Sequence, residues 1–447
     1  MTDQNDQLTL LADLLKAAKK AGADAADAVT FNAASLAVSC RMGELEKLER
    51  AESNDLGLRV LIGRKQAMVS STDFKPDTLR EVVERAVAMA KAAPEDRYCG
   101  LADPEQLVRN PPALEICDTV EPTGEELIEA VRTAEDAARS VAGVTNSEGA
   151  EAGWSHADIS IATTNGFARS YASSSHSLSA SVLAGEGTAM ERDYDFTSAV
   201  YREDLEDPAA IGRSAGERAV RRLGGRKVKT RQVPVVYDPR VSGGLVRHFA
   251  GAINGAAIAR GTSFLKNSLN GKVFADGVTI VDDPHRPRGM RSKPFDAEGL
   301  ANRRRALAEN GILTTWVMDL ASARQLGLES TGNASRGTAS PPSPATTNIY
   351  MEAGSVSPGD LMADIAEGFY VTEMIGMGVN MVTGDYSRGA SGFWIENGEL
   401  TYPVTEMTIA GSLREMFARL TPADDLVFRF GTDAPTIRID GMTVAGV

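Results

Sequence analysis

Histidine and cysteine are scarce in this sequence, which limits the metal chemistry that the chain can support. Its 447 residues include four histidines and three cysteines. The histidines are His156, His176, His248 and His285, and no two of them form an HxxxH, HExxH or HxH pair. A zinc site usually needs three or four nitrogen, sulfur or oxygen ligands, at least two of them closely spaced. The sequence therefore lacks the signature of a metal site of its own.

The cysteines are few, form no closely spaced pair in the sequence and lie in the first third of the chain. They are Cys40, Cys99 and Cys117, and no CxxC occurs among them. An odd number without such spacing argues against a disulfide framework and indicates a reducing compartment. The N-terminus also lacks the basic and apolar regions of a signal peptide, and no apolar run approaches the ~18 residues that cross a membrane. We expect a cytoplasmic protein with no membrane segment.

Positive charge is in deficit, because 47 Lys and Arg face 61 Asp and Glu for a net charge of −14. A general nucleic-acid binder needs a basic surface, so we expect no direct nucleic-acid partner. One basic run, RAVRRLGGRKVKTR at 218–231, stands apart. We interpret it as a solvated helix end and linker, and a polyanion-binding patch is the alternative.

Hydrophobic periodicity predicts an α+β protein, and the length suits two domains or three. We place a boundary in the basic run and predict an N-terminal α/β domain, residues 1–226, of small twisted sheets with flanking helices. The helices expected there cover about 8–21, 76–89, 127–141 and 208–223, the third opened by a Thr123–Glu126 capping box. The strands expected there are 27–32 with 36–41, 57–62 with 66–71, and a pair joined by Asn165-Gly166.

The remaining residues, 227–447, predict a β-rich C-terminal domain with one helix near its start. A strand at 233–237 precedes that helix, expected at about 239–259. Asn-Gly pairs at 310–311 and 397–398 indicate two hairpins. Between the hairpins lies a low-complexity loop, 331–347, of a length typical of functional or disordered segments.

Motifs for a self-sufficient active site are weak. Ser263 and Lys266 match the SxxK pattern of serine–lysine nucleophiles, but neither SDN nor KTG supports the match. A run of serines at 173–175 before His176 could pair a hydroxyl with a base, although an alternating polar strand face explains it better. There is no GxSxG elbow, Walker loop or GxGxxG.

Two groups of charged residues are open to more than one interpretation. The carboxylates Asp282, Asp283 and Asp296 flank a turn and could bind a divalent cation, although such residues more often cap turns. Three arginines at 303–305 could grip a carboxylate, although a solvated face is the simpler interpretation.

The most distinctive segment is GMGVNMVTGDYSRGASGFWIENGEL at 376–400. Its glycines allow positive φ or close backbone approach, and the Asn-Gly hairpin provides a rigid base. Between the glycines stand Asp385, Tyr386, Ser387 and Arg388. Such a loop suits binding or subunit contact, and packing within its own domain is the alternative.

This segment and several others resemble the TldD/PmbA family, in particular its PmbA (TldE) branch. The resemblance extends over nearly the whole chain, and 376–400 is its most specific part. The other segments that carry it are 53–74, 241–258, 276–284, 295–300 and 340–355.

The resemblance implies a cytoplasmic metallopeptidase that degrades unfolded peptides and trims peptide precursors. In the TldD branch a helix carries HExxxH, and a cysteine near the C-terminus completes the metal site. Here those helix positions fall on His248, Phe249 and Ile253, and no cysteine follows Cys117. One imidazole without partners cannot hold zinc, and without a metal there is no activated water. The resemblance thus implies no catalytic residue and no metal or other cofactor in this chain.

By the same resemblance, the expected partner is a TldD-like catalytic subunit that holds zinc or a similar divalent metal. This chain would form a heterodimer with it, line the substrate channel and contact unfolded peptides through Asp385, Tyr386, Ser387 and Arg388. Sheet edges at the two Asn-Gly hairpins could hold an extended peptide by strand addition. A homodimer of the isolated chain is also compatible with the family.

Two other functions stay open at this point. One is a non-enzymatic modulator that binds another protein, since the PmbA branch was first described as an indirect modulator of DNA gyrase. The other is a self-sufficient hydrolase that uses Ser263 and Lys266 or an unrecognised metal site at His248.

Overall fold

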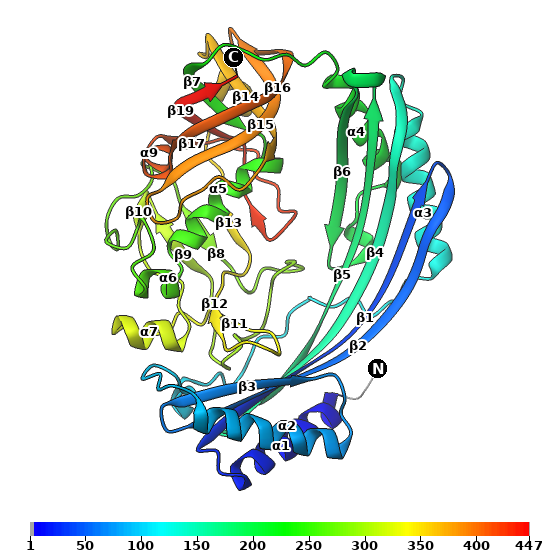
Figure 1. Cartoon of the computed structure of the whole chain (residues 1–447). Coiled ribbons are helices and arrows are strands. Elements are labelled where there is room, and N and C mark those ends of the chain that lie inside the picture. Colours follow the sequence, from blue (N-terminus) through cyan, green and yellow to red (C-terminus); the bar gives the residue numbers. More distant parts are fainter. Residues whose placement is uncertain (1–3, 447) are drawn as a thin grey trace.

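The computed structural model describes residues 4–446 and shows two lobes. The N-terminal lobe is a long curved sheet backed by helices, and the C-terminal lobe lies on the concave side of that sheet (Figure 1). The predicted α+β class is confirmed. Within the described residues, no helix has the length and apolar character needed to cross a membrane.

The N-terminal lobe is built on one antiparallel sheet, whereas small separate sheets are expected from the sequence. Most of its strands are long because alternating small and polar residues continue without a turn signal. Its strands are β1 (Ala25–Arg41), β2 (Glu44–Ile62), β3 (Lys65–Ser71), β4 (Val144–Thr163), β5 (Ala168–Ala184) and β6 (Glu191–Ala199). Among the described residues their order in the sheet is β3-β2-β1-β4-β5-β6.

Two of the three predicted strand pairs in this lobe are confirmed, and one is wrong. The β2–β3 hairpin and the β4–β5 hairpin at Asn165-Gly166 form as predicted. The segments 27–32 and 36–41, predicted to pair with each other, are instead one continuous strand, β1. The turn comes later, at Met42 and Gly43, where φ is 54° and 82°. No residue between Asn32 and Leu36 supplies comparable turn chemistry.

The helices of this lobe all cover the convex face of the sheet. Side chains alternate between faces along a strand, so the even-numbered residues of β1 share one face. Ala26 and Ala28 pack under the first two helices, and Leu36 and Val38 pack in the cluster under the next two. The capping box of Thr123 and Glu126 is present as predicted. The helices are α1 (Gln4–Lys20), α2 (Pro76–Ala92), α3 (Gly124–Arg139) and α4 (Pro208–Arg221), with short 3-10 turns η1 (Pro104–Gln106), η2 (Gly187–Ala189) and η3 (Arg202–Asp204).

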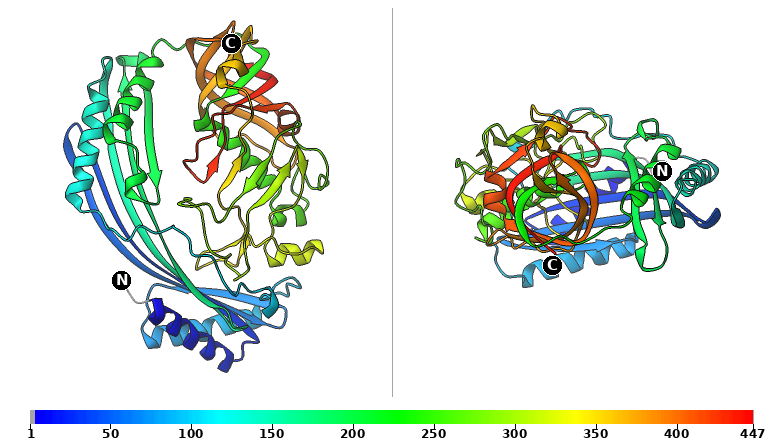
Figure 2. Two further views of the ribbon diagram at one scale, coloured as in Figure 1. Left: turned by 180° about the vertical axis from the view of Figure 1, so that it is seen from behind. Right: turned by 90° about the horizontal axis from the view of Figure 1, so that it is seen from above.

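The C-terminal lobe consists of a small barrel and a second sheet. Its strands are β7 (Arg231–Tyr237), β8 (Ile280–Asp282), β9 (Arg305–Glu309), β10 (Ile312–Leu313), β11 (Ala334–Ser335), β12 (Ser343–Pro344), β13 (Ile349–Met351), β14 (Glu367–Ile375), β15 (Asp385–Glu396), β16 (Glu399–Ser412), β17 (Leu420–Pro422), β18 (Thr432–Asp433) and β19 (Ile437–Ala445). The barrel closes because β16 pairs with β19 in addition to β15. The right-hand view of Figure 2 looks down this ring of strands. Both predicted Asn-Gly hairpins, β9–β10 and β15–β16, are confirmed.

The helices of this lobe differ from the prediction of a single helix at 239–259. That helix ends at Ala252, and Asn254 starts a new one by accepting hydrogen bonds from the amides of Ala256 and Ala257. Asparagine is a favoured N-cap, which explains the break. In the part of the chain that the structure describes, the helices of this lobe are α5 (Pro239–Ala252), α6 (Gly255–Ala259), α7 (Leu320–Leu326), α8 (Pro358–Met362) and α9 (Leu413–Ala418).

The two lobes meet in a buried ion cluster around Asp27 of β1. Arg59 of β2 donates to Asp27 Oδ2 from Nε at 2.6 Å, and Arg336 of the loop 331–347 pairs with Oδ1. Asp27 and both arginine side chains are almost fully buried. Beside them, a Cβ on Gly57 would lie 2.4 Å from the backbone oxygen of Thr338, so only glycine lets this loop rest on β2. The low-complexity loop thus holds the C-terminal lobe on the sheet.

The basic run at 218–231 also joins the lobes, and much of it is neutralised by acids. Arg222 pairs with Glu191 of β6 and with Glu373 of β14. Arg231 pairs with Glu367 at 2.6 Å. These contacts favour the linker interpretation over a polyanion-binding patch.

We predict that Arg336→Ala lowers the stability of the chain by about 3 kcal/mol, because it removes one arginine partner from the buried carboxylate of Asp27. Chemical denaturation measures the loss, and limited proteolysis should show earlier cutting in 331–347. Arg304→Ala is the matched control, since its pair with Glu352 is half exposed and should contribute less than about 1 kcal/mol. Equal losses for the two variants would contradict this role of Arg336.

Candidate functional site

The candidate site lies where α5 crosses the barrel. Asp238 caps the helix by accepting from the amide of Arg240 at 2.9 Å, and Pro239 occupies its first turn. Tyr370 of β14 donates to the other oxygen of Asp238 at 2.9 Å, which fixes the helix start against the barrel. The helix therefore has a rigid position relative to β14 and β15.

His248 of α5 is half-buried and lies against β15. Its ring centroid is 6.0 Å from that of Tyr386, in an edge-on arrangement. Burial lowers the pKa of His248 to about 4, and the positive charges of Arg388 and Arg247 add to this effect. The imidazole is thus neutral near pH 7, with cationic side chains as its neighbours.

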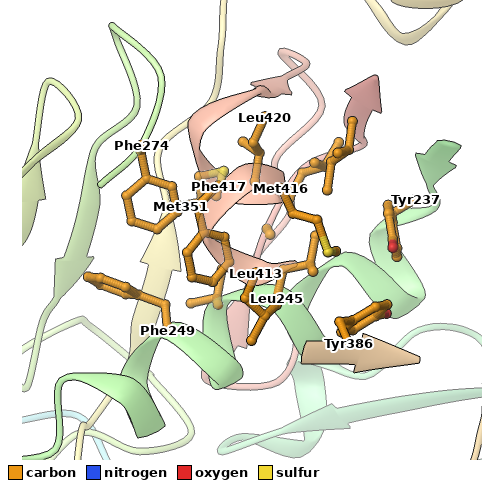
Figure 3. Close-up of a cluster of buried hydrophobic side chains, with 14 of the residues drawn as sticks. Tyr237, Leu245, Phe249, Phe274, Met351, Tyr386, Leu413, Met416, Phe417 and Leu420 are labelled. Atoms are coloured by element: carbon orange, nitrogen blue, oxygen red, sulfur yellow. The ribbon is translucent and has the colours of Figure 1, made fainter. Parts of the chain in front are cut away.

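The other two degenerate motif positions, Phe249 and Ile253, lie inside the core. Both side chains have 0% exposure. Residues four apart share a helix face, so both project from the same inward side of α5. The Phe249 ring packs edge-on against Phe274 at 4.9 Å and Phe417 at 6.2 Å (Figure 3). Neither position can present a ligand toward the outer side of the helix, where His248 lies.

The four contact candidates from the glycine-rich segment do not share one surface. Asp385 and Ser387 are exposed, Arg388 is half-buried and Tyr386 is 2% exposed. This alternation follows from their place on strand β15. Tyr386 and Arg388 share the face toward α5, so the structure brings His248 together with two of the four. Their role in substrate or partner contact stays a prediction.

The glycines of this segment are required by close backbone packing. A Cβ on Gly378 would lie 1.8 Å from the backbone oxygen of Ser387, and one on Gly392 would lie 1.9 Å from that of Tyr370. Any larger residue would force the strands apart. Much of the distinctive pattern therefore encodes the fold of the barrel edge.

An apolar loop beside the site was not singled out from the sequence. Ile375, Met377 and Val382 are 60%, 93% and 56% exposed. Met381 of the same loop reaches α5, since its Cε would lie 3.3 Å from a Cβ on Gly251. Large exposed apolar side chains close together mark contact surfaces. The alternation of methionine and valine with glycine in 375–382 is the signal that could have identified them.

The carboxylates Asp282 and Asp296 organise the loop 331–347. Asp282 accepts from Thr347 and from the Asn333 side chain at 2.7 Å. Asp296 accepts from the backbone amides of Glu298, Leu300 and Ala334. Burial raises the pKa of both carboxyls. Across residues 4–446, no group of three or more His, Cys, Asp or Glu side chains is placed to hold a metal ion.

The serine motifs have structural partners. Ser263 is 1% exposed and donates to the Ala252 oxygen at 2.5 Å. Lys266 Nζ donates instead to the Gly261 oxygen at 3.4 Å, so the serine–lysine pair does not form. In the serine run, Ser174 donates to the Val200 oxygen, and His176 pairs with Asp118 at 3.2 Å. The hydrolase interpretation based on Ser263 and Lys266 is therefore wrong in its geometry.

Comparison with known proteins gives the same architecture. Models of the PmbA/TldA metallopeptidase match residues 32–90 as domain 1, 118–223 as the central domain and 230–446 as the C-terminal domain. The metalloprotease PmbA of Escherichia coli O157:H7 is 36% identical, with 95% of this chain and 92% of that protein covered. A Bacteroides thetaiotaomicron protein described as a modulator of DNA gyrase matches in structure over all of both chains, with a TM-score of 0.91 and 28% identity. TldE of Thermococcus kodakarensis has the same fold, with a TM-score of 0.87 at 21% identity over 98% of this chain and all of that one.

A helix-backed curved sheet joined to a barrel that carries α5 is thus the architecture that this chain shares with these proteins. The chain belongs to the PmbA/TldD metallopeptidase family, and within it to the PmbA/TldE branch.

We predict that Phe249→Glu combined with Ile253→His restores the motif letters without restoring a metal site. The new carboxylate would be buried without a partner, and its desolvation together with the lost packing should cost more than about 3 kcal/mol. Unfolding and zinc titration of the purified variant test this. Phe249→Leu is the control and should cost less than about 1.5 kcal/mol. A stable double variant that binds zinc would contradict the inward orientation.

We also predict that Arg388→Ala raises the pKa of His248 from about 4, while burial still holds it below 6.5. An NMR titration of the ring, assigned with His248→Gln, measures the shift. The pKa of His248 is lower in the folded state than in the unfolded state. At a pH between these two pKa values, the unfolded state therefore binds more protons. The stability contributed by neutral His248 is therefore lost as pH falls from 6.5 through 4. An unchanged pKa in Arg388→Ala would exclude the proposed charge effect.

Proposed function

We propose that this chain is the non-catalytic subunit of a two-chain metallopeptidase that degrades unfolded peptides and processes peptide precursors. A TldD-like partner would supply zinc or a similar divalent metal, its ligands and the general base. This chain would form part of the channel wall and contact the extended substrate. We further propose that it acts in the cytoplasm, where its three free cysteines would stay reduced.

One observation carries this proposal: Phe249 and Ile253, at the two motif positions after His248, are side chains of the hydrophobic core. A catalytic zinc site needs about three protein ligands that converge on one point. Here the helix offers one imidazole, and the charges nearest to it belong to Arg388 and Arg247. Positive neighbours oppose the binding of a divalent cation. The family fold is thus retained while the chemistry would have to come from another chain.

The apolar loop 375–382 supports a contact role beside α5. Its exposed Ile375, Met377 and Val382 offer apolar surface that a partner or an unfolded peptide would bury. The edges at the two hairpins are less available for strand addition. Lys272 bridges to Ile312 on the outer side of β10, and Leu313 exchanges backbone hydrogen bonds with Asn270 and Gly271. The β16 strand pairs on both sides over 408–410.

A second candidate function is a modulator that acts by binding another protein. The structural relative from Bacteroides thetaiotaomicron carries such a description. The same exposed loop would serve that role, so the surface alone does not separate the two functions. Cleavage of peptides in the presence of the partner separates them.

The test uses unfolded casein with this chain alone, the TldD-like partner alone, and both together. We expect cleavage by the mixture that a chelator stops, and elemental analysis should find the metal in the partner only. Chelator-sensitive cleavage by this chain alone would contradict the proposal. A mixture that forms a complex without cleaving casein would favour the modulator.

Two surface variants locate the contact. Met377→Asp should reduce cleavage by the mixture at least about tenfold, because it places a charge in the apolar loop. Val427→Asp is the control, since Val427 is 55% exposed on a different segment and should leave cleavage unchanged. Equal effects of the two variants would remove the loop from the contact surface.

A further inference from the structure

A second cluster of reactive side chains lies in the N-terminal lobe, on the convex face of its sheet. The segment before α3 runs along the edge of β5, where the Ser174 amide donates to the Ile116 oxygen at 3.1 Å. The next residue but one, Asp118, donates from its amide to Ser174 Oγ at 2.6 Å. These two bonds hold Cys117 over the sheet.

Cys117 faces a histidine that a carboxylate orients. Its Sγ lies 3.5 Å from His156 Nδ1 on β4. On the other side of the ring, His156 Nε2 lies 3.3 Å from Asp158 Oδ2. A carboxylate only accepts, so the ring proton belongs on Nε2 and the lone pair of Nδ1 faces the thiol. Cys117, His156 and Asp158 are thus arranged as a nucleophile, its base and the group that orients the base, which is the arrangement that activates a nucleophile.

The positions of all three groups are restrained. His156 and Asp158 are 7% and 8% exposed, and both come from one strand face, two residues apart. Gln4 of α1 donates to the second oxygen of Asp158 at 2.9 Å. The Trp154 ring stacks beside the imidazole, with centroids 6.3 Å apart. Cys117 itself is half-buried, so solvent still reaches it.

Burial raises the pKa of the Cys117 thiol, and the charge of Asp158 adds to the shift. The thiol is therefore protonated near neutral pH, and attack requires a base within hydrogen-bond reach. His156 is that base. Burial also raises the pKa of Cys99, the other half-buried thiol, which makes Cys99 an internal reference.

Unsatisfied polar atoms next to the cluster point to a ligand. Asn32 of β1 is directly opposite Asp158 in the sheet register and is 9% exposed. Both atoms of its side-chain amide lack a hydrogen-bond partner among residues 4–446. In the next row of the same face, Thr30 and Ser160 are opposite each other, and their hydroxyls also lack partners within that range. Buried polar groups are normally satisfied, so this row suits a small polar ligand.

We infer that Cys117, His156 and Asp158 form a thiol site that accepts an acyl group from a thioester or similarly activated carbonyl donor. The thiol proton passes to His156 Nδ1, and Sγ forms a bond to the carbonyl carbon. The bond from that carbon to the leaving group breaks, and the leaving group departs with the proton from Nδ1. The product is S-acylated Cys117, and the step needs no oxidant or metal.

The experiment exposes the full chain to p-nitrophenyl acetate near neutral pH and follows acetylation of each cysteine by mass spectrometry. We expect Cys117 to be acetylated at least about tenfold faster than Cys99, since general base catalysis contributes about 100-fold or more. His156→Gln should remove that advantage without changing the rate at Cys99. Asp158→Asn should reduce it, because the ring loses the carboxylate that orients it.

The controls separate chemistry from folding. His285→Gln changes a half-buried histidine whose Nε2 lies 2.8 Å from Asn302 Oδ1, and it should leave the rate at Cys117 unchanged. If His156→Gln does not fold, the test is the ratio of the acetylation rate of Cys117 to that of Cys99 in the unaltered protein. A ratio of one or less overturns the inference, and so does an unchanged ratio in a folded His156→Gln variant.

Discussion

The placement of the C-terminal lobe depends on one buried carboxylate, Asp27, which lies between arginines from both lobes. Arg59 alone would leave one oxygen of this buried carboxylate without a partner, so the loop that carries Arg336 completes the cluster. The loop in turn requires Gly57 on β2, because its backbone lies where a side chain would be. The ion pair between Arg336 and Asp27 and the absence of a Cβ on Gly57 thus determine how the low-complexity loop 331–347 folds.

The barrel helix illustrates how core packing excludes polar side chains from one face of a helix. In α5 the inward face carries Leu245, Phe249 and Ala252, all buried in the core cluster of the lobe. Aromatic and aliphatic side chains at these positions increase the buried apolar area, and a ligand side chain there would be desolvated. The helix is capped by Asp238, and its His248 contacts Tyr386 of β15. Phe249 and Ile253 therefore contribute to the core, and a ligand side chain at either position would displace this packing.

Local signals in the sequence predict a large part of this fold, and long-range ones do not. Three hairpins are predicted from their turn residues, because asparagine and glycine favour the backbone conformations of tight turns. These turns are Asn165-Gly166, Asn310-Gly311 and Asn397-Gly398. The break at Asn254 and the continuous β1 were not predicted, although the N-cap at Asn254 and the turn at Met42 and Gly43 are local signals for both. The proximity of His248 to Tyr386 could not be read from spacing. The same holds for Cys117 and His156, which are 39 residues apart and meet only because the segment before α3 follows the edge of β5.

The two candidate sites of this chain lie in different lobes, and they differ in how their side chains are placed. At α5 the two positions predicted to be degenerate, Phe249 and Ile253, are occupied by core residues. At β4 the strand alternation places a base and its orienting carboxylate on one face, within reach of a thiol. Alternation along a strand brings residues i and i+2 together at no conformational cost. A new polar group on the inward face of α5, by contrast, would have to displace core packing. The chemistry proposed for Cys117 therefore depends on residues that are separate from α5 and the barrel.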